Sequence, residues 1–175
     1  MSNPNPRTIT LISSDNDELT ISYDAMYCRP APDKWMSELV HAQVEDQKQD
    51  EDLHYRASLP IVSTETLKQI IDFINLYSYS PMKEIEKPLK SSVLADLVGV
   101  YFAKIVDEPT QEELFKLTNA ANFMNIPPLL ALCCAKVATM IKSQSPEQIR
   151  KMFGVGDITP QEEQTVRQYN RWCEE

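Results

Sequence analysis

Residues 126–175 read IPPLLALCCAKVATMIKSQSPEQIRKMFGVGDITPQEEQTVRQYNRWCEE, and the start and stop signals in this stretch predict three helices. The first helix opens with two prolines and is apolar nearly all round over Leu129–Ile141, so we expect it to be buried. The second begins in a cap at 145–148 and stops at Gly154. The third begins in a similar cap at 159–162, which again combines a hydroxyl residue, a proline and a capping side chain.

The last predicted helix is polar apart from a thin stripe of apolar side chains. These are Val166, Tyr169, Trp172 and Cys173. Such a stripe is too narrow to close a core by itself, and a Trp on a polar helix is well suited to anchor an interface. Trp172 could instead pin the helix to the core of its own chain. The polar composition of the helix favours the partner anchor.

The composition of the chain is that of an acidic globular protein. Its 175 residues, 42% hydrophobic and 25% charged, suffice for one buried core or for one domain plus an extension. The net charge of -9 argues against nucleic acid and anionic membranes as partners. The sequence contains no apolar run of about 18 residues and no apolar signal region. We therefore expect a soluble, intracellular protein.

No residue pattern in the sequence indicates catalysis or metal binding. The four cysteines lack the spacing of a metal or redox motif and are expected to be free thiols. No Ser, Cys or Asp motif surrounds either His41 or His54, so both are interpreted as exposed surface residues. The three glycines do not form a phosphate-binding pattern. We therefore predict a protein that is not an enzyme and that uses no cofactor.

The N-terminal part predicts a small β-sheet. Alternating residues at 8–12 and 18–23, separated by the turn SSDND, indicate a hairpin. A third strand is predicted within 56–62, where Pro60 would place it at an edge or near its end. The polar segment 43–52 is interpreted as a solvated loop.

Amphipathic helices follow these strands. The helix after the third strand has one apolar face, formed by Leu67, Ile70, Ile71, Ile74 and Tyr77. The segment 78–92 is a predicted linker, because its prolines prevent a continuous helix. A further helix is predicted over 93–106, although Gly99 weakens it. A capping box of Thr110 and Glu113 opens the next helix. Sheet and helices together indicate an α+β fold.

Several segments, in their order along the chain, resemble one protein family. They are TITLISSDND (8–17), LPIVSTETLKQIIDF (59–73), LFKLTNAANFMNIPPLLALCCAKVATMIK (114–142), SPEQIRKMFGV (145–155) and ITPQEEQTVRQYNRWCEE (158–175). This order resembles the S-phase kinase-associated adaptors of SCF ubiquitin ligases. The resemblance spans nearly the whole chain and is most specific from Leu114 to Glu175.

The resemblance implies a two-part organisation. Residues 1–142 would form a BTB/POZ-type domain, a small three-stranded sheet flanked by helices, and residues 143–175 a two-helix extension. In the family the first part binds a cullin, and the extension with the preceding core helix binds an F-box motif. The chain is therefore expected to be a non-catalytic adaptor that links F-box substrate receptors to a cullin in ubiquitin-dependent protein degradation. A cytoplasmic and nuclear location is expected with this role.

The resemblance also implies which residues form each surface. Asn122 and Phe123 match the asparagine–aromatic pair at the cullin surface of the family. The implied F-box-binding residues are Leu130, Cys133, Val137, Met140, Ile141, Ile149, Met152, Phe153 and Trp172. The family pattern implies no catalytic residue, no metal ligand and no cofactor.

Two departures from the family pattern lie in the cullin-facing half. Residues 97–102 (LVGVYF) stand where family members carry a Trp-Asp pair before a phenylalanine, and extra residues precede Thr110. Residues 28–32 contain two prolines where a helix would be expected to begin. The F-box-facing half follows the family pattern closely, so the sequence predicts a divergent paralogue that binds F-box proteins.

The sequence leaves other functions open beside the adaptor. A BTB-type structural protein would act without a cullin, as a homodimer formed through the apolar surface when no F-box protein is bound. A protein similar to elongin C would end near residue 142, and the segment 145–175 argues against it. An enzyme has little support beyond the presence of ordinary nucleophiles.

Overall fold

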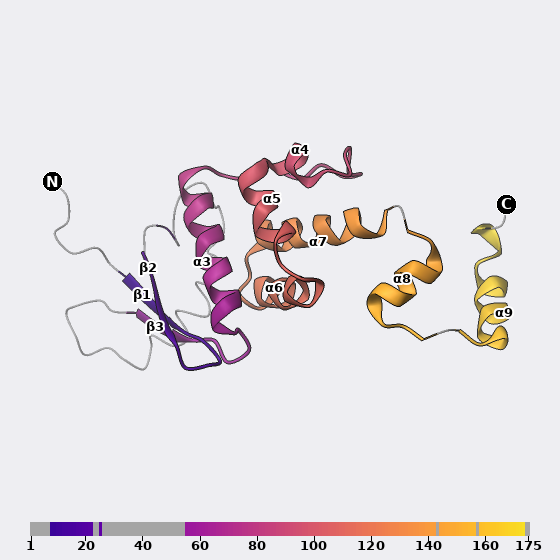
Figure 1. The fold of residues 1–175 in the computed structure, drawn as a ribbon, viewed down its shortest axis with the longest axis horizontal. Coiled ribbons are helices and arrows are strands. Elements are labelled where there is room, and N and C mark those ends of the chain that lie inside the picture. Colours follow the sequence, from indigo (N-terminus) through magenta and orange to yellow (C-terminus); the bar gives the residue numbers. More distant parts are fainter. Residues whose placement is uncertain (1–7, 23–24, 26–54, 143, 157, 174–175) are drawn as a thin grey trace. The chain divides into compact units, whose positions relative to one another are not determined.

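The computed structural model describes residues 8–22, 25, 55–142, 144–156 and 158–173. The chain divides into two compact units, of which the first ends at Thr139 and the second begins at Met140 (Figure 1). The predictions made for 26–54 lie outside the described residues. They include the two prolines, the acidic loop and both histidines.

Three strands form a small sheet in the first unit, in the order β2-β1-β3 (Figure 1). The central strand β1 (Thr8–Ile12) pairs antiparallel with β2 (Glu18–Ser22) and parallel with β3 (Tyr55–Ser58). The predicted hairpin and the predicted edge position of the third strand are both confirmed. The third strand is shorter than predicted and ends before Pro60, whose missing N–H cannot continue a ladder.

The two faces of the sheet differ in polarity, because side chains alternate along each strand. The buried face consists of Ile9, Leu11, Ile21 and Ala57. On the opposite face, Arg56 of β3 forms an ion pair with Glu18 of β2 across the central strand. Helix α3 (Thr64–Tyr79) lies beside the sheet and contacts β2 (Figure 1).

α3 has the amphipathic character that its sequence predicts. Its N-cap Ser63 accepts a hydrogen bond from a backbone N–H of the first turn. The large side chains that it buries are Leu67, Ile70, Phe73 and Ile74. Ile71 and Tyr77, which were predicted on this face, are only half-buried. Phe73, which the predicted stripe omitted, has no exposed surface at 0%.

Two short helices replace the single helix that was predicted over 93–106. They are α4 (Leu94–Val98) and α5 (Val100–Asp107). Gly99 separates them with a φ of 88°, a backbone conformation that favours glycine and that no helix contains. The prediction of one continuous helix is therefore wrong, and the glycine that weakened it is the cause.

α6 (Gln111–Phe123) and α7 (Pro127–Ile141) follow, and α7 runs across the boundary between the two units. The predicted capping box of α6 is confirmed. The backbone N–H of Thr110 donates to Oε2 of Glu113 at 2.7 Å, and the Thr110 hydroxyl accepts from the Glu113 N–H.

The second unit contains the two predicted C-terminal helices, α8 (Pro146–Phe153) and α9 (Pro160–Tyr169). Both start in a complete capping box, at Ser145 and at Thr159, with proline in the first turn. These predicted starts are confirmed. α8 also stops at Gly154 as predicted, with a left-handed φ of 64°.

The last helix ends earlier than predicted. α9 stops at Tyr169, and Trp172 lies in a single 3-10 turn, η1 (Arg171–Cys173). The side-chain amide of Asn170 donates to the carbonyl of Val166 at 2.9 Å. The same carbonyl also accepts the backbone N–H of Asn170 at 3.0 Å, so the backbone and the side chain of this residue together cap the last turn of α9.

The loop between β1 and β2 binds the first residue of α3. The backbone N–H of Thr64 donates to Oδ2 of Asp15, and its hydroxyl donates to Oδ2 of Asp17, both at 2.8 Å. The hydroxyl of Ser13, which is only 3% exposed, lies 2.8 Å from that of Thr64. The loop thus places two carboxylates at the N-terminus of α3. There they accept hydrogen bonds from Thr64 and interact favourably with the positive end of the helix dipole.

The Asp15→Asn variant should lose less stability in acid than the wild type does. The backbone N–H of Thr64, then the hydroxyls of Thr64 and Ser14, lower the pKa of Asp15 below its ordinary 3.8. Because the pKa is lower in the folded state, this stabilisation is complete above the unfolded pKa and is lost as pH falls through the folded one. Between pH 7 and about pH 2.5, Tm should therefore fall less for Asp15→Asn than for the wild type. Asp72→Asn is the control, because Asp72 is an exposed residue of α3. Equal falls of Tm in the wild type and in Asp15→Asn would contradict the prediction.

Candidate partner-binding surfaces

α7 has a buried face and a face that is open to solvent. Its buried side chains are Leu129, Leu132, Cys133 and Ala135. Along the other face Cys134 is exposed, while Leu130, Val137 and Ile141 are half-buried. Spacings of four, three and four residues align these four side chains along one side of the helix. We call them the α7 stripe.

Cys133 lies beneath the α7 stripe. Its side chain has no exposed surface, at 0%, and it forms a hydrogen bond with Thr118 of α6. Burial raises the pKa of the Cys133 thiol to about 12, against the opposing effect of the Thr118 hydrogen bond. A side chain without exposed surface cannot touch a partner on this face, so its predicted contact role is corrected. The spacing from Leu130 could have identified the exposed Cys134 in its place.

The predicted residues that precede and form α8 lie at or near the surface. Met140, Ile149 and Met152 are half-buried, and Phe153 is 40% exposed. Met152 and Phe153 follow Ile149 by three and by four residues, so both lie on the same face of the helix as Ile149. The three residues therefore form one apolar face of α8, and their contact with an F-box motif stays a prediction.

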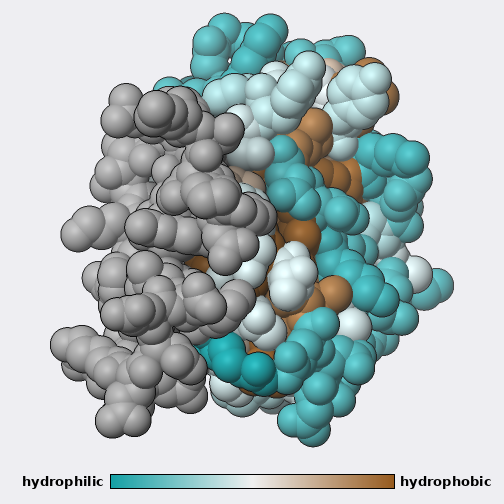
Figure 2. Space-filling view, turned by 90° about the vertical axis from the view of Figure 1, so that its left-hand side faces the viewer, coloured by the Kyte–Doolittle hydropathy of each residue, from teal (hydrophilic) through white to brown (hydrophobic). Residues whose placement is uncertain are grey.

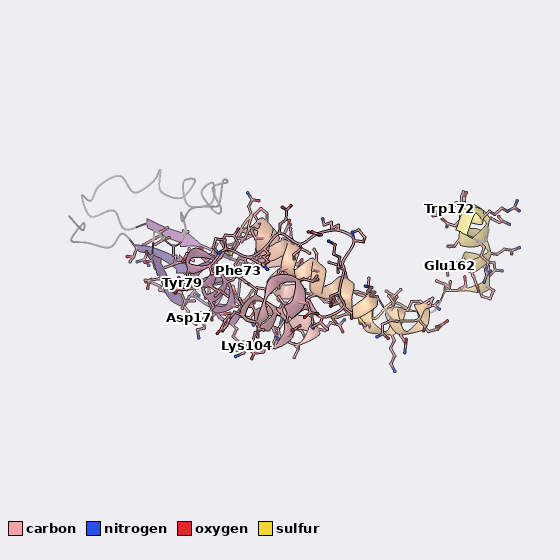
Figure 3. The ribbon with its side chains drawn as sticks, turned by 90° about the horizontal axis from the view of Figure 1, so that it is seen from above. Asp17, Phe73, Tyr79, Lys104, Glu162 and Trp172 are labelled. Atoms are coloured by element: carbon pink, nitrogen blue, oxygen red, sulfur yellow. The ribbon has the colours of Figure 1, made fainter. Side chains whose placement is uncertain are left out.

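Apolar side chains also protrude from α9 and η1. Trp172 is 75% exposed in η1, where Figure 3 shows it at the end of the chain. Tyr169 and Val166 are 82% and 54% exposed on α9. On the polar side of this helix, Glu163 and Arg167 form an ion pair at 3.1 Å. Of the predicted stripe, Val166 and Tyr169 of α9 and Trp172 of η1 thus face solvent.

Two further exposed apolar residues lie between α8 and α9. Val155 is 57% exposed and Ile158 is 44% exposed. Neither residue was predicted as a site residue, although they are the large apolar residues of the connection between the two helices. They extend the apolar surface of the second unit.

The helices of the second unit have no buried core of their own. In α8 and α9 none of the side chains is buried. Local contacts stabilise their ends: the N–H of Thr159 donates to Oε2 of Glu162 at 2.8 Å and lowers the pKa of that carboxyl (Figure 3). Apolar groups that stay half-buried or exposed contribute less to folding than buried ones, so a partner that covers them would add stabilisation.

The predicted cullin pair lies at the C-terminal end of α6. Asn122 is exposed and Phe123 is half-buried, while Met124 and Ile126, which follow directly, are both 0% exposed. The buried residues fix the end of the helix in the core of the first unit. Asn122 and Phe123 therefore occupy a well-supported surface position.

The segment that departs from the family pattern also exposes apolar side chains. Val100 and Tyr101, in the first turn of α5, are 69% and 76% exposed. On the face drawn in Figure 2, by contrast, the described hydrophobic residues appear only as narrow patches between hydrophilic ones. The described surface of that face offers no broad apolar area.

The described residues contain no group of three His, Cys, Asp or Glu side chains that could hold a metal ion. No helix among them is long and apolar enough to cross a membrane.

A family model described as "Skp1 family, dimerisation domain" matches residues 127–173, which cover α7, α8, α9 and η1. The S-phase kinase-associated protein 1 homolog of Tetrahymena thermophila is 41% identical over 79% of this chain and 82% of its own length. The SCF ubiquitin ligase complex protein SKP1a of Dictyostelium discoideum is 38% identical over 67% of this chain and 72% of its own length.

Suppressor of kinetochore protein 1 of Schizosaccharomyces pombe is similar over a longer span, with 34% identity over 95% of this chain and 98% of its own length. These matches extend beyond the α7–η1 segment to most of the first unit. They confirm the resemblance that the sequence motifs indicated, and the chain therefore belongs to the Skp1 family.

Proposed function

We propose that this protein is a non-catalytic adaptor of an SCF ubiquitin ligase, which links F-box substrate receptors to a cullin in ubiquitin-dependent protein degradation. The single observation that carries this proposal is the apolar surface of the second unit, whose helices bury none of their side chains. The names of the relatives support it, because they include "SCF ubiquitin ligase complex protein SKP1a" and "E3 ubiquitin ligase complex SCF subunit sconC".

The F-box protein would bind the apolar residues of α7, α8 and η1. The contact residues that we propose are Leu130, Val137, Met140, Ile141, Ile149, Met152, Phe153 and Trp172, with Cys133 supporting α7 from beneath. Burying these side chains against a partner removes apolar area from water, the main favourable term in association. Trp172 has the largest side chain of the set and is proposed as the anchor.

The cullin would bind the first unit at Asn122 and Phe123. Their position at the end of α6, on the buried Met124 and Ile126, supports a rigid contact surface. We further propose that residues 1–142 form a BTB/POZ-type domain and 143–175 a separate extension. The sheet order β2-β1-β3 and a compact unit that ends at Thr139 support this division.

The absence of a catalytic role is part of the proposal. Several glutamates have lowered pKa values, and the cause in each case is a hydrogen bond from a capping residue. Glu113, for example, accepts from the backbone N–H of Thr110. These shifts have a structural explanation and do not indicate general acids or bases.

Co-purification with one F-box protein and with one cullin N-terminal domain, scored separately, tests the two halves of the proposal. An adaptor is expected to retain each partner alone and both together. Retention of the F-box protein without the cullin would limit the function to F-box binding. Retention of neither would refute the adaptor function.

A second candidate is a BTB-type structural protein that acts as a homodimer without a cullin. The description of the matching model as a dimerisation domain over 127–173 favours it, as does the exposed apolar surface of the second unit. Light scattering over a range of concentrations, with and without an F-box peptide, separates the two candidates. A dimer that the peptide does not dissociate would favour the structural protein.

A further inference from the structure

The burial of α7 stops partway along the helix. Its buried side chains end at Ala135. From Lys136 to Ile141 every side chain is only half-buried. This second half of α7 contains Val137, Met140 and Ile141, which belong to the proposed contact residues. Apolar burial therefore fixes the first half of α7 more firmly than the half that presents these residues.

An ion pair joins the start of this second half to α5, whose C-terminal end lies beside α7 (Figure 1). Nζ of Lys136 donates a hydrogen bond to Oδ1 of Asp107 at 2.7 Å. The two side chains are 24% and 45% exposed, so water screens this pair less than a fully exposed one. The neighbouring pair of Lys104 and Glu108, at 3.3 Å, is more exposed and links residues only four apart in the chain. The pair of Lys136 and Asp107 connects two helices instead.

The position of Asp107 is unfavourable for a carboxylate within α5 alone. Asp107 is the last residue of this helix, where the negative end of the helix dipole disfavours a negative charge. Glu108 follows as the C-cap and adds a second negative charge there. A side chain that breaks a local preference needs compensation from elsewhere in the fold. Lys136 of α7 supplies it, so the pair serves the arrangement of the two helices.

We infer that Lys136 and Asp107 are positioning residues, whose ion pair holds the second half of α7 in the orientation that an F-box protein binds. This inference rests on the proposed adaptor function. Neither residue is among the proposed contact residues, so the pair acts through Val137, Met140 and Ile141. When a binding surface is displaced for part of the time, the apparent affinity falls with the fraction that is competent to bind. Removal of the pair should therefore weaken F-box binding although no contact residue is changed.

Calorimetric titration of full-length variants with one F-box protein tests the inference. Asp107→Asn should weaken the affinity by about threefold, which is within the contribution of a partly exposed ion pair. Asp107→Lys replaces the attraction by a repulsion between two ammonium groups, so a loss of about tenfold is expected. Circular dichroism checks the fold of each variant. Asp107→Asn alone decides the test if Asp107→Lys does not fold.

Exchange of the two charges separates positioning from a general loss of structure. In the double variant Asp107→Lys/Lys136→Asp opposite charges again face each other, so its affinity should return to within about threefold of the wild type. Glu108→Lys is the matched control, because it changes the net charge by the same amount at the next residue and breaks the pair with Lys104. Its affinity should stay within about twofold of the wild type, as expected for an exposed pair.

The outcomes distinguish this inference from the proposed function. Weakened binding of the Asp107 variants, together with recovery in the exchanged variant and unchanged binding of Glu108→Lys, supports it. Wild-type affinity of the folded Asp107 variants, no recovery in a folded exchanged variant, or an equal loss in Glu108→Lys would each overturn the inference and leave the adaptor function intact. Failure of the wild-type chain to bind any F-box protein would overturn both.

Discussion

Trp172→Ala is expected to weaken F-box binding by about 30-fold or more, which corresponds to the roughly 2 kcal/mol of an interface hot spot. The indole is 75% exposed in η1, so the free protein gains little from it. Its full area becomes buried only when a partner covers it. Truncation should therefore reduce affinity and leave the fold of the first unit unchanged. Calorimetric titration with an F-box protein measures the affinity.

Tyr79→Ala is the matched control for Trp172→Ala. Tyr79 is also a highly exposed aromatic residue, at 91%, but it lies on α3 of the first unit. Its truncation should leave F-box affinity unchanged. If Trp172→Ala binds as tightly as the wild type, the assignment of η1 to the F-box surface is wrong. If both variants lose affinity equally, binding depends on exposed aromatic area in general and not on a defined site.

Locally encoded features of the fold could be predicted from the sequence. The capping boxes at Thr110, Ser145 and Thr159 are all present, because each cap is formed within four consecutive residues. The hairpin of β1 and β2 could be predicted for the same reason, since its pattern and its turn are contiguous. These elements need no information from distant parts of the chain.

Features that depend on distant contacts could not be predicted. Periodicity alone favoured a continuous helix over 93–106, and it does not determine that Gly99 adopts a φ of 88°, which separates α4 from α5. The central position of Phe73 on α3 depends on Phe102, which lies on α5. The spacing within α3 instead pointed to Ile71, which is half-buried.

The exposure of the candidate site residues could be predicted from the sequence in one place and not in another. The sequence identified Trp172 as exposed because its helix is polar on every other side. On α7 nearly every residue is apolar, so composition could not distinguish Cys133 from Cys134. Only the packing of α7 against α6, where Cys133 meets Thr118, determines which thiol faces solvent.

Phe73→Ala is expected to lower the free energy of unfolding by about 3–5 kcal/mol, the range for removing a large aromatic side chain from a core. Phe73 is 0% exposed, and its ring centroid lies 5.7 Å from those of both Tyr77 and Phe102. The variant loses the buried area, leaves a cavity and removes two aromatic contacts. Because the contact with Phe102 joins α3 to α5, the loss should affect the whole first unit.

Urea unfolding followed by circular dichroism measures the effect of Phe73→Ala, and Phe73→Leu serves as a milder variant if the alanine form does not fold. Leucine keeps most of the apolar volume, so a smaller loss is expected from it. Tyr79→Ala, an exposed aromatic residue on the same helix, should change the unfolding free energy by no more than about 0.5 kcal/mol. A loss below about 1.5 kcal/mol for Phe73→Ala would contradict the central place of this ring in the core, because it would imply that the surrounding side chains close the cavity.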